Sequence, residues 1–444
     1  MVDTILSTQP LLTRRYHNSP RAMRIGIVPD LRSNAGGIYQ YSITMLHALR
    51  EWSETGCPDE FVILTEENDH PAIQEFHRPA WTVHPSKPRS LKRTAKTILT
   101  RFGLEAAGLD ILSKLRGGSK PFDVDRVQSR PQDKQWLRSL GIELAFYPAP
   151  QTRSFEIGLP YVMSIHDLQH RLQPEFPEVS ANGEWEYREY LFRNGARHAT
   201  LILADSEVGK EDVLNFYGEY GVAPERVKVL PFLPASYLPS KVSAEERSRV
   251  RKKYNLSERF LFYPAQFWPH KNHARIVRAL GLLKQQKIEP AIAFCGSSEG
   301  AIRRNTLKEV MAAADESKVD GQIRNLGYVP DEDMGGLYAE AAALVMPTFF
   351  GPTNIPFLEA WRFGCPVITS DIRGIREQTG DAAVLVDPKS VEAIADGIRK
   401  IWTGAELCKR LAAAGRERLG HYTPADFRNR LITIVEEAKA YATR

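Results

Sequence analysis

The segment 342–371 brings together residue types that could hold a phosphorylated ligand. Thr353-Asn354-Ile355 stands just before Pro356, a residue typical of the first turn of a helix. Backbone N–H groups at a helix N-terminus are unpaired and lie at the positive end of the helix dipole, so they could bind a phosphate without a basic side chain. Glu359 follows on about the same helix face, where its carboxylate could accept two hydrogen bonds from a ribose diol. The segment therefore fits a nucleotide, although an ordinary capped helix with a solvated Glu fits it as well.

Five further loops carry residues suited to ligand binding directly after an apolar run of strand length. They contain Gly36-Gly37, His166-Asp167, Gln266 through Lys271, Gly296, and Tyr328-Val329. Glycine lets a backbone approach a ligand closely, and the ammonium of Lys can bind an anion. In an open parallel sheet, ligands lie beyond the carboxyl ends of the strands. These loops and the segment 342–371 are therefore predicted to line one cleft.

The elements that flank the segment must place its residues at the end of a strand. Ala342 to Met346 and Val367 to Thr369 have the length and apolar character of strands. The helix between them is expected to stop where Gly364 can adopt a left-handed conformation and Pro366 prevents its continuation. A strand-helix-strand unit implies parallel strands with a right-handed crossover. Because both halves of the chain repeat this alternation, we predict an α/β fold with two doubly wound domains.

The length of 444 residues exceeds the size at which one hydrophobic core stops growing, so two domains are expected. Pro231, Pro234 and Pro239 indicate an extended linker between them. We predict a flexible tail, two domains and a final helix that could pack back on the N-terminal domain. Their bounds are 1–22 for the tail, 23–235 and 236–422 for the domains, and 423–444 for the helix.

Composition excludes several classes of protein. The four cysteines lie far apart, without a Cys-x-x-Cys pair or a nearby His cluster, so neither disulfides nor a structural metal site is expected. No run of about eighteen apolar residues predicts a membrane span, and the first two dozen residues lack the apolar core of a signal peptide. These features lead us to expect a cytoplasmic protein.

A basic segment interrupts the alternation of strands and helices in the N-terminal half. Residues 87–138 contain thirteen Lys or Arg and five Asp or Glu, a local charge of +8 in a chain of net charge +5. Within this insertion, residues of about 90–116 interleave apolar and basic side chains, as in a basic amphipathic helix that lies on an anionic membrane surface. A solvated basic face on a core-packed helix is the alternative. The absence of aromatic stacking residues and of a known binding motif argues against a nucleic-acid partner.

Four groups of residues together resemble the family 4 retaining glycosyltransferases of the GT-B fold, over nearly the whole chain from about Met23. They are Gly36-Gly37-Ile38-Tyr39, Ser164-Ile165-His166-Asp167-Leu168, Pro269-His270-Lys271-Asn272, and Pro356-Phe357-Leu358-Glu359-Ala360 with Gly364-Cys365-Pro366-Val367. The resemblance implies two Rossmann-like domains that face each other across a cleft. It also implies transfer of a hexose or deoxyhexose from a nucleotide-sugar to a glycan or lipid-linked glycan. The anomeric configuration would be kept, with no metal and no cofactor, at the inner face of the cell membrane.

The resemblance also implies roles for individual residues. Lys271 would neutralise the diphosphate leaving group, and His166 would contact the donor sugar near the reacting centre. Glu359 would hold the ribose, and Thr353, Asn354 and Ile355 would hold the phosphate or donor sugar. Gly36 and Gly37 would approach phosphate or acceptor, and Asp167 would orient its loop. Gly296, Tyr328 and Val329 would lie on the donor side, with Tyr328 and Val329 flanking the base.

Two positions depart from the pattern of the family. Gln266 stands where the family usually has an Arg that pairs with the leaving phosphate, and Gly351 stands where it usually has a Glu that contacts the donor sugar. Gln can donate a hydrogen bond to a phosphate but cannot form an ion pair with it. Arg275, Arg373 and Arg376 are candidates for the missing charge. The departures imply an altered sugar preference or, alternatively, a non-catalytic protein that binds a nucleotide-sugar.

Overall fold

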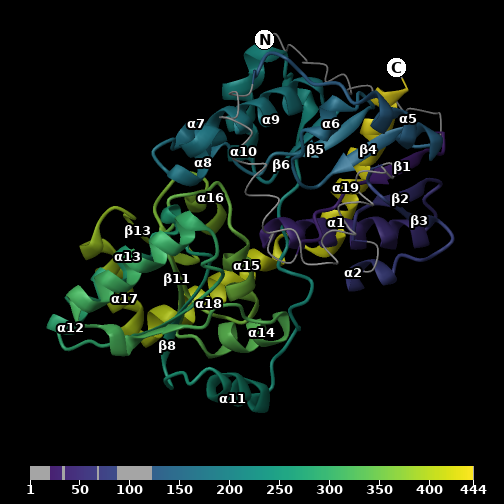
Figure 1. Cartoon of the computed structure of the whole chain (residues 1–444). Helices are drawn as coiled ribbons and strands as arrows, with labels where there is room; N and C mark the ends of the chain where they lie inside the picture. Colours follow the sequence, from purple (N-terminus) through teal and green to yellow (C-terminus); the bar gives the residue numbers. More distant parts are fainter. Residues whose placement is uncertain (1–20, 33–35, 68–69, 88–122, 444) are drawn as a thin grey trace, which may run out of the picture.

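The computed structural model describes residues 21–32, 36–67, 70–87 and 123–443. The predicted tail up to residue 20 and the predicted membrane-binding stretch 90–116 lie outside these ranges. The described chain forms two parallel sheets, one in each half of the sequence (Figure 1). The prediction of two doubly wound α/β domains is confirmed.

The first sheet has seven strands in the order β3-β2-β1-β4-β5-β6-β7. The strands are β1 (Arg24–Ile27), β2 (Glu60–Leu64), β3 (Trp81–His84), β4 (Leu144–Tyr147), β5 (Tyr161–Ser164), β6 (Leu201–Ala204) and β7 (Val227–Val229). The helices of this half are α1 (Gly37–Glu54), α2 (Pro71–Gln74), α5 (Pro131–Ser139), α6 (Arg153–Glu156), α7 (Gln169–Leu172), α8 (Pro177–Ser180), α9 (Glu184–His198) and α10 (Glu207–Tyr217). All the pairings are parallel, so the carboxyl ends of the strands share one edge.

The second sheet has six strands in the order β10-β9-β8-β11-β12-β13. The strands are β8 (Phe260–Pro264), β9 (Ala291–Cys295), β10 (Ile323–Asn325), β11 (Ala343–Met346), β12 (Val367–Ser370) and β13 (Ala383–Val386). The helices are α11 (Ala244–Lys253), α12 (His273–Gln285), α13 (Ala301–Ser317), α14 (Asp331–Glu340), α15 (Ile355–Arg362), α16 (Ile375–Thr379), α17 (Val391–Thr403), α18 (Ala405–Gly420) and α19 (Pro424–Ala442). Short 3-10 turns occur at η2 (Ala181–Gly183), η3 (Gly218–Tyr220), η4 (Pro224–Arg226), η5 (Pro269–Lys271) and η6 (Asp320–Gln322).

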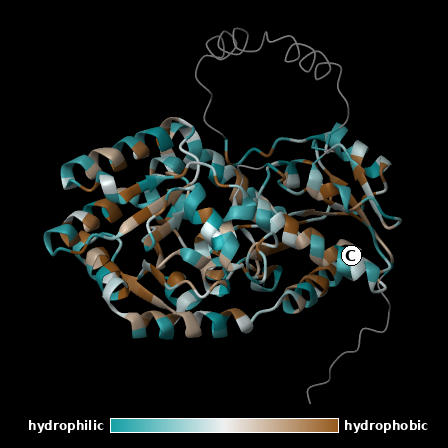
Figure 2. Ribbon diagram, turned by 90° about the horizontal axis from the view of Figure 1, so that it is seen from below, coloured by the Kyte–Doolittle hydropathy of each residue, from teal (hydrophilic) through white to brown (hydrophobic). Residues whose placement is uncertain are grey.

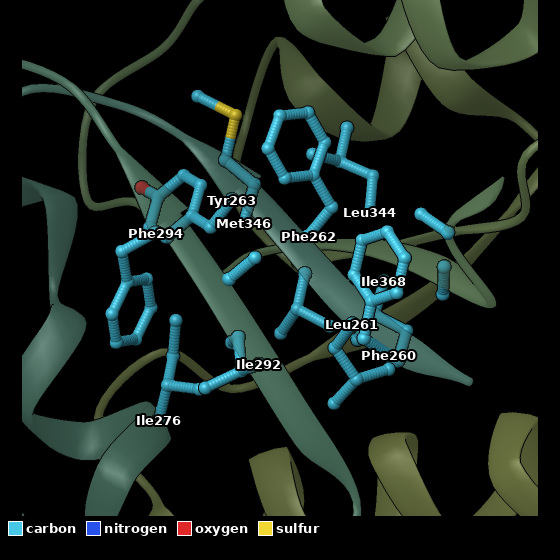
Figure 3. Close-up of a cluster of buried hydrophobic side chains, with 14 of the residues drawn as sticks. Phe260, Leu261, Phe262, Tyr263, Ile276, Ile292, Phe294, Leu344, Met346 and Ile368 are labelled. Atoms are coloured by element: carbon cyan, nitrogen blue, oxygen red, sulfur yellow. The ribbon is translucent and has the colours of Figure 1, made fainter. Parts of the chain in front are cut away.

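Apolar side chains of the second sheet form the core that holds its loops in place. Figure 3 shows Phe260, Phe262 and Tyr263 of β8 beside Leu344 and Met346 of β11, all of them buried. Hydrophobic residues gather along the strands and the inner faces of the helices in both domains (Figure 2). Strands that are buried on both faces read as continuous apolar runs, as these do.

The unit from β11 to β12 forms as its sequence predicts. Leu344 pairs with Val367 and Met346 with Thr369 in parallel register. Helix α15 ends before Gly364, whose φ of 69° is the left-handed conformation expected there. The N-terminus of α15 thus lies just beyond the carboxyl end of β11.

The last helix crosses back from the second domain to the first. Helix α19 packs against α1 and β4, and in Figure 1 it lies in yellow among the purple and blue elements of the N-terminal half. Phe427, Leu431 and Val435 of α19 are buried in the core of the first sheet. Lys439 of the same helix pairs with the buried Asp59 at 2.8 Å. The chain therefore joins the two domains twice, through residues 230–243 and through the segment that leads into α19.

Candidate functional site

A cavity of about 560 Å³ lies between the two domains, at the carboxyl ends of both sheets. It is large enough for a small organic ligand. The residues predicted from the sequence that line it are Gly36, Gly37, His166, Asp167, Gln266, Lys271, Gly351, Thr353, Asn354 and Ile355. Loops that lie more than 300 residues apart in the chain therefore converge on one site.

Lys271 places an unpaired positive charge in this cavity. It stands at the end of η5, and its side chain makes no salt bridge or hydrogen bond with any residue in the described ranges. Burial lowers the pKa of Lys271 from 10.5 to about 8, and the negative charges of Asp167 and Glu178 oppose that change only in part. An ammonium removed from water without a partner is unfavourable unless an anion pairs with it. The cavity therefore contains a fixed positive charge suited to an anionic ligand.

The N-terminus of α15 is open, but one predicted donor there is already used. Asn354 provides no side-chain cap, so the N–H groups of the first helical turn face the cavity edge without one. The Asn354 N–H, however, donates to Gln378 Oε1 at 2.8 Å, while Gln378 Nε2 donates to the Asn354 carbonyl at 2.9 Å. The Asn354 N–H is therefore already paired within the protein, and its binding of phosphate stays a prediction. The amides of Thr353 and Ile355 remain the candidates.

The N-terminus of α1 faces α15 across the cavity. Gly36 has a φ of 58°, and a Cβ at Gly37 would lie 3.3 Å from Ile355 Cδ1. Because Gly37 has no side chain, the two domains can approach each other closely at this point. A larger residue at position 37 would narrow the entrance between the two helix ends.

His166 and Asp167 follow β5 at the cavity wall. The His166 ring lies within 2.9 Å of the Pro148 carbonyl through Nε2, which donates to it in the neutral tautomer. Burial lowers the pKa of His166, so the ring is neutral near pH 7 and Nδ1 can accept a hydrogen bond from a hydroxyl. Burial would raise the pKa of Asp167, but Arg188 and the N–H of Gln169 outweigh that effect and lower it. Asp167 is thus tied to its own loop.

Several donor-side predictions fall outside the cavity wall. Glu359 is buried and accepts a hydrogen bond of 2.6 Å from the Tyr338 hydroxyl, and burial raises its pKa to about 7. Its second oxygen has no partner among the described residues. Gly296 is required for packing, because a Cβ there would lie 2.5 Å from the Ala265 carbonyl oxygen.

Two further positions were predicted to flank a base. Tyr328 is 73% exposed and directly follows Gly327, whose carbonyl accepts a hydrogen bond of 2.8 Å from the Gly296 N–H. The Val329 side chain is buried in the core of the second sheet, so its predicted place beside a base would involve its backbone. Only Tyr328 of this pair is available to a ligand through its side chain.

The cation missing at Gln266 is replaced in space by a residue that the sequence did not single out. Arg303 of α13 donates to Gln266 Oε1 at 2.6 Å, and its guanidinium lies 4.7 Å from the centre of the Trp268 ring. Gln266 and Trp268 both line the cavity. The positive charge therefore sits one side chain behind the wall.

The three arginines suggested by the sequence are used elsewhere. Arg373 pairs with Asp212 and Glu211, and Arg376 pairs with Asp371. Arg275 donates to Asn272 and lies over Phe349. None of the three is among the residues that line the cavity.

Two carboxylates of the N-terminal domain also line the cavity and were missed. Asp205 directly follows β6 and accepts a hydrogen bond of 2.5 Å from the Thr353 hydroxyl of the other domain. Burial raises the pKa of Asp205 to about 7. Its place after a strand could have identified it by the rule that identified His166. Glu178 lies on the short helix α8, and no local sequence signal marks it.

Known proteins resemble this chain in sequence and in structure. Residues 244–418 match the family described as "Glycosyl transferases group 1". The chain is 28% identical over 237 residues to O-antigen chain mannosyltransferase B of Escherichia coli. This alignment covers 52% of this chain and 58% of that protein. It is 26% identical over 257 residues to lipopolysaccharide glucosyltransferase WaaG of Escherichia coli. This second alignment covers 53% of this chain and 62% of WaaG. The matched region thus spans somewhat more than half of each of these relatives.

Solved structures match over almost the whole chain. The structure of Anabaena Alr3699/HepE in complex with UDP-glucose has a TM-score of 0.66 and 16% identity, and covers 93% of this chain and 99% of that one. The structure of WaaG has a TM-score of 0.61 and 15% identity, with the same coverage of 93% and 99%.

The two facing parallel sheets and the cavity between their carboxyl ends define the GT-B fold, as the sequence predicted. The matches support the predicted resemblance to family 4, and residues 244–418 of the C-terminal half are similar to group 1 glycosyltransferases.

Helices that are long and apolar enough to cross a membrane are missing from the described ranges. Groups of three or more His, Cys, Asp or Glu in a metal-binding arrangement are likewise not found in the part of the chain that the structure describes.

Proposed function

We propose that the protein is a retaining glycosyltransferase. In this proposal it moves a hexose or deoxyhexose from a nucleotide-sugar to a glycan or lipid-linked glycan without a metal ion. The observation that carries the proposal is the unpaired ammonium of the half-buried Lys271 in the cavity between the domains. A nucleoside diphosphate placed there would complete this charge and meet the N-terminus of α15.

The same charge would assist the reaction. As the bond between the sugar C1 and the diphosphate oxygen breaks, negative charge grows on the leaving group, and a fixed ammonium stabilises it. The acceptor oxygen would form its bond to C1 on the face from which the diphosphate departs. The acceptor proton would pass to the leaving phosphate oxygen, which yields a nucleoside diphosphate and a glycoside of unchanged configuration. Neutral His166 would accept a hydrogen bond from a sugar hydroxyl through Nδ1.

The relatives narrow the first donors to test. Their names describe mannosyl and glucosyl transferases, and one structural neighbour was solved with UDP-glucose. We therefore expect a nucleoside-diphosphate mannose or glucose to raise the melting temperature of the purified protein. A ligand at about a hundred times its Kd adds roughly 2.7 kcal/mol of stability. Failure of every nucleoside diphosphate and nucleotide-sugar to shift the melting curve would refute the proposal, and unchanged turnover in excess EDTA is the expected result for a metal-independent reaction.

A non-catalytic nucleotide-sugar-binding protein is the second candidate. Gln266 and Gly351 favour it, because both replace charged groups that the resemblance assigns to the donor site. Binding of a nucleotide-sugar without release of nucleoside diphosphate, against water and against glycan and lipid extracts, would support this candidate over the enzyme.

Attachment to the cytoplasmic face of a membrane is part of the proposal. It depends on the basic and apolar residues of about 90–116, which lie outside the described ranges. The full chain should sediment with vesicles that contain anionic phosphatidylglycerol at low salt and be released at high salt. Failure to sediment with these vesicles at low salt would count against the membrane surface as a partner.

A further inference from the structure

Glu178 crosses from the N-terminal domain to the loop that carries Lys271. Its Oε1 accepts a hydrogen bond of 3.1 Å from the His270 backbone N–H and a second of 2.6 Å from His270 Nδ1. His270 directly precedes Lys271 in η5. Glu178 also lines the cavity, although it comes from a helix that no motif identified.

The other oxygen of this carboxylate is unsatisfied. Glu178 Oε2 is buried and has no hydrogen-bond partner among the described residues, and only 6% of the side chain is exposed. Buried polar atoms nearly always have partners, so an orphaned carboxylate oxygen at a cavity wall indicates that a donor group is still to come.

The charge of Glu178 is not cancelled by its neighbour. Burial lowers the pKa of His270 to about 4, so the ring is neutral near pH 7. Burial opposes ionisation of Glu178, but the hydrogen bonds from His270 outweigh it and lower the pKa of the carboxyl. An ionised carboxylate accepts hydrogen bonds and donates none, and such bonds are stronger than those between neutral groups. The oxygen is therefore suited to a hydroxyl group.

The surroundings of Glu178 adjoin the position that lacks the carboxylate of the family. The His270 ring stacks on Phe350 at 3.8 Å with an interplanar angle of 4°, and Phe176 meets Phe350 edge to face at 5.2 Å. Phe350 directly precedes Gly351, whose carbonyl accepts a hydrogen bond of 3.0 Å from Gln169 of the N-terminal domain. These contacts fix Glu178 and Gly351 on the same side of the cavity.

We propose that Glu178 recognises a hydroxyl of the donor sugar through its free oxygen, and that it supplies from the N-terminal domain the carboxylate that Gly351 does not provide. This inference rests on the proposed function, because it assumes a nucleotide-sugar in the cavity. Glu178 would then decide which hexose is accepted, whereas Lys271 and α15 hold the diphosphate. Specificity arises because the unpaired carboxylate disfavours a sugar that lacks the hydroxyl.

The test compares Glu178→Gln with Glu175→Gln. Glu175 is exposed, lies three residues away and is not part of the cavity wall, so its variant controls for loss of charge in this segment. The donor is the nucleotide-sugar that stabilises and is turned over by the unmodified protein, and it is compared with analogues that lack one sugar hydroxyl each. Nucleoside diphosphate alone serves as the probe for the Lys271 side.

We expect Glu178→Gln to lower kcat/KM for the full donor by about 10- to 100-fold and Glu175→Gln to leave it unchanged. The loss should vanish for one deoxy analogue, and the Kd of the nucleoside diphosphate should change less than about twofold. An equal loss for every analogue together with weaker nucleoside diphosphate binding would overturn the inference in favour of a role in holding the Lys271 loop. Full activity of Glu178→Gln on all donors would also overturn it. If the unmodified protein bound no nucleoside diphosphate or nucleotide-sugar, the proposed function itself would fail.

Discussion

Replacement of Lys271 by Met should make the protein more stable and should weaken its binding of the ligand. The Met side chain fills a similar space without a charge. Lys271 has no partner among the residues that the structure describes, so the substitution removes a buried charge and breaks no ion pair. The substitution therefore separates a binding role of Lys271 from a structural one.

The magnitude follows from the pKa of the folded protein. Burial lowers the pKa of Lys271 from 10.5 to about 8. At 1.36 kcal/mol for each pKa unit, the charged form destabilises the folded state by about 3 kcal/mol. Because the pKa in the folded state is lower than in the unfolded state, this destabilisation is complete below pH 8 and disappears as the pH rises from 8 to 10.5. At pH 7 the variant should melt several degrees higher than the unmodified protein, and at pH 10.5 the difference should be small.

Ligand binding should change in the opposite sense. A cation and a phosphate about 4 Å apart interact by roughly 4 kcal/mol near a protein surface. Loss of most of that attraction corresponds to a fall of about a hundredfold or more in affinity for a nucleoside diphosphate. Calorimetric titration of both proteins with UDP and GDP, together with melting curves of the ligand-free proteins, gives both quantities.

The reasoning would be refuted by a Lys271→Met variant that melts below the unmodified protein at pH 7 and binds nucleoside diphosphate equally well. Lys271→Arg serves as the matched control, because it keeps a positive charge in the cavity. It should retain much more of the affinity than Lys271→Met.

Further predictions concern the other charged groups of the site. The kcat/KM of the free enzyme should have an optimum between about pH 7 and 8, because Glu359 ionises as the pH rises through about 7 and Lys271 loses its proton above about 8; a flat pH profile from 6 to 9 would contradict this. Glu359→Gln should weaken nucleoside diphosphate binding by roughly 10-fold, because the proposed ribose contact is lost, and should leave inhibition by inorganic pyrophosphate unchanged. If nucleoside diphosphate binding and pyrophosphate inhibition weakened equally, the substitution would have distorted the site. Arg303→Leu should lower kcat by roughly 10-fold, because the cation behind Gln266 is lost. Replacement of its exposed neighbour Arg304 by Leu should leave kcat unchanged. Equal kcat values for the two variants would contradict a catalytic contribution of Arg303.

The fold could be predicted from the sequence because its determinants are local. The run Ala343–Met346, the left-handed Gly364 and Pro366 act within a few residues of the elements that they shape. The strands are buried on both faces, and this burial leaves the continuous apolar runs from which they were recognised. The return of α19 to the first domain could be stated only as an option, since its contacts involve residues about 380 positions away.

The candidate site was predictable where a residue lies in the loop that follows a strand. His166 and Lys271 fall in this class, because the carboxyl ends of parallel strands meet at one edge. Glu178 lies on a helix that reaches the cavity only through tertiary packing, and Arg303 lies on a helix that reaches only Gln266 behind the wall, so their sequence positions carried no signal. The hydrogen bond that pairs the Asn354 amide was not visible in the sequence for a related reason, because its partner lies 24 residues later in the chain.

Donor turnover tests the central claim most directly. The purified protein is incubated with nucleotide-sugars, with and without glycan or lipid extracts, and the released nucleoside diphosphate is measured beside Lys271→Met. The anomeric configuration of the first product is read by proton NMR. We predict release of nucleoside diphosphate with one sugar donor, retention of configuration and a loss of at least about tenfold in the variant. Absence of release with every donor, inversion of configuration, or equal rates for the two proteins would contradict the proposed enzyme.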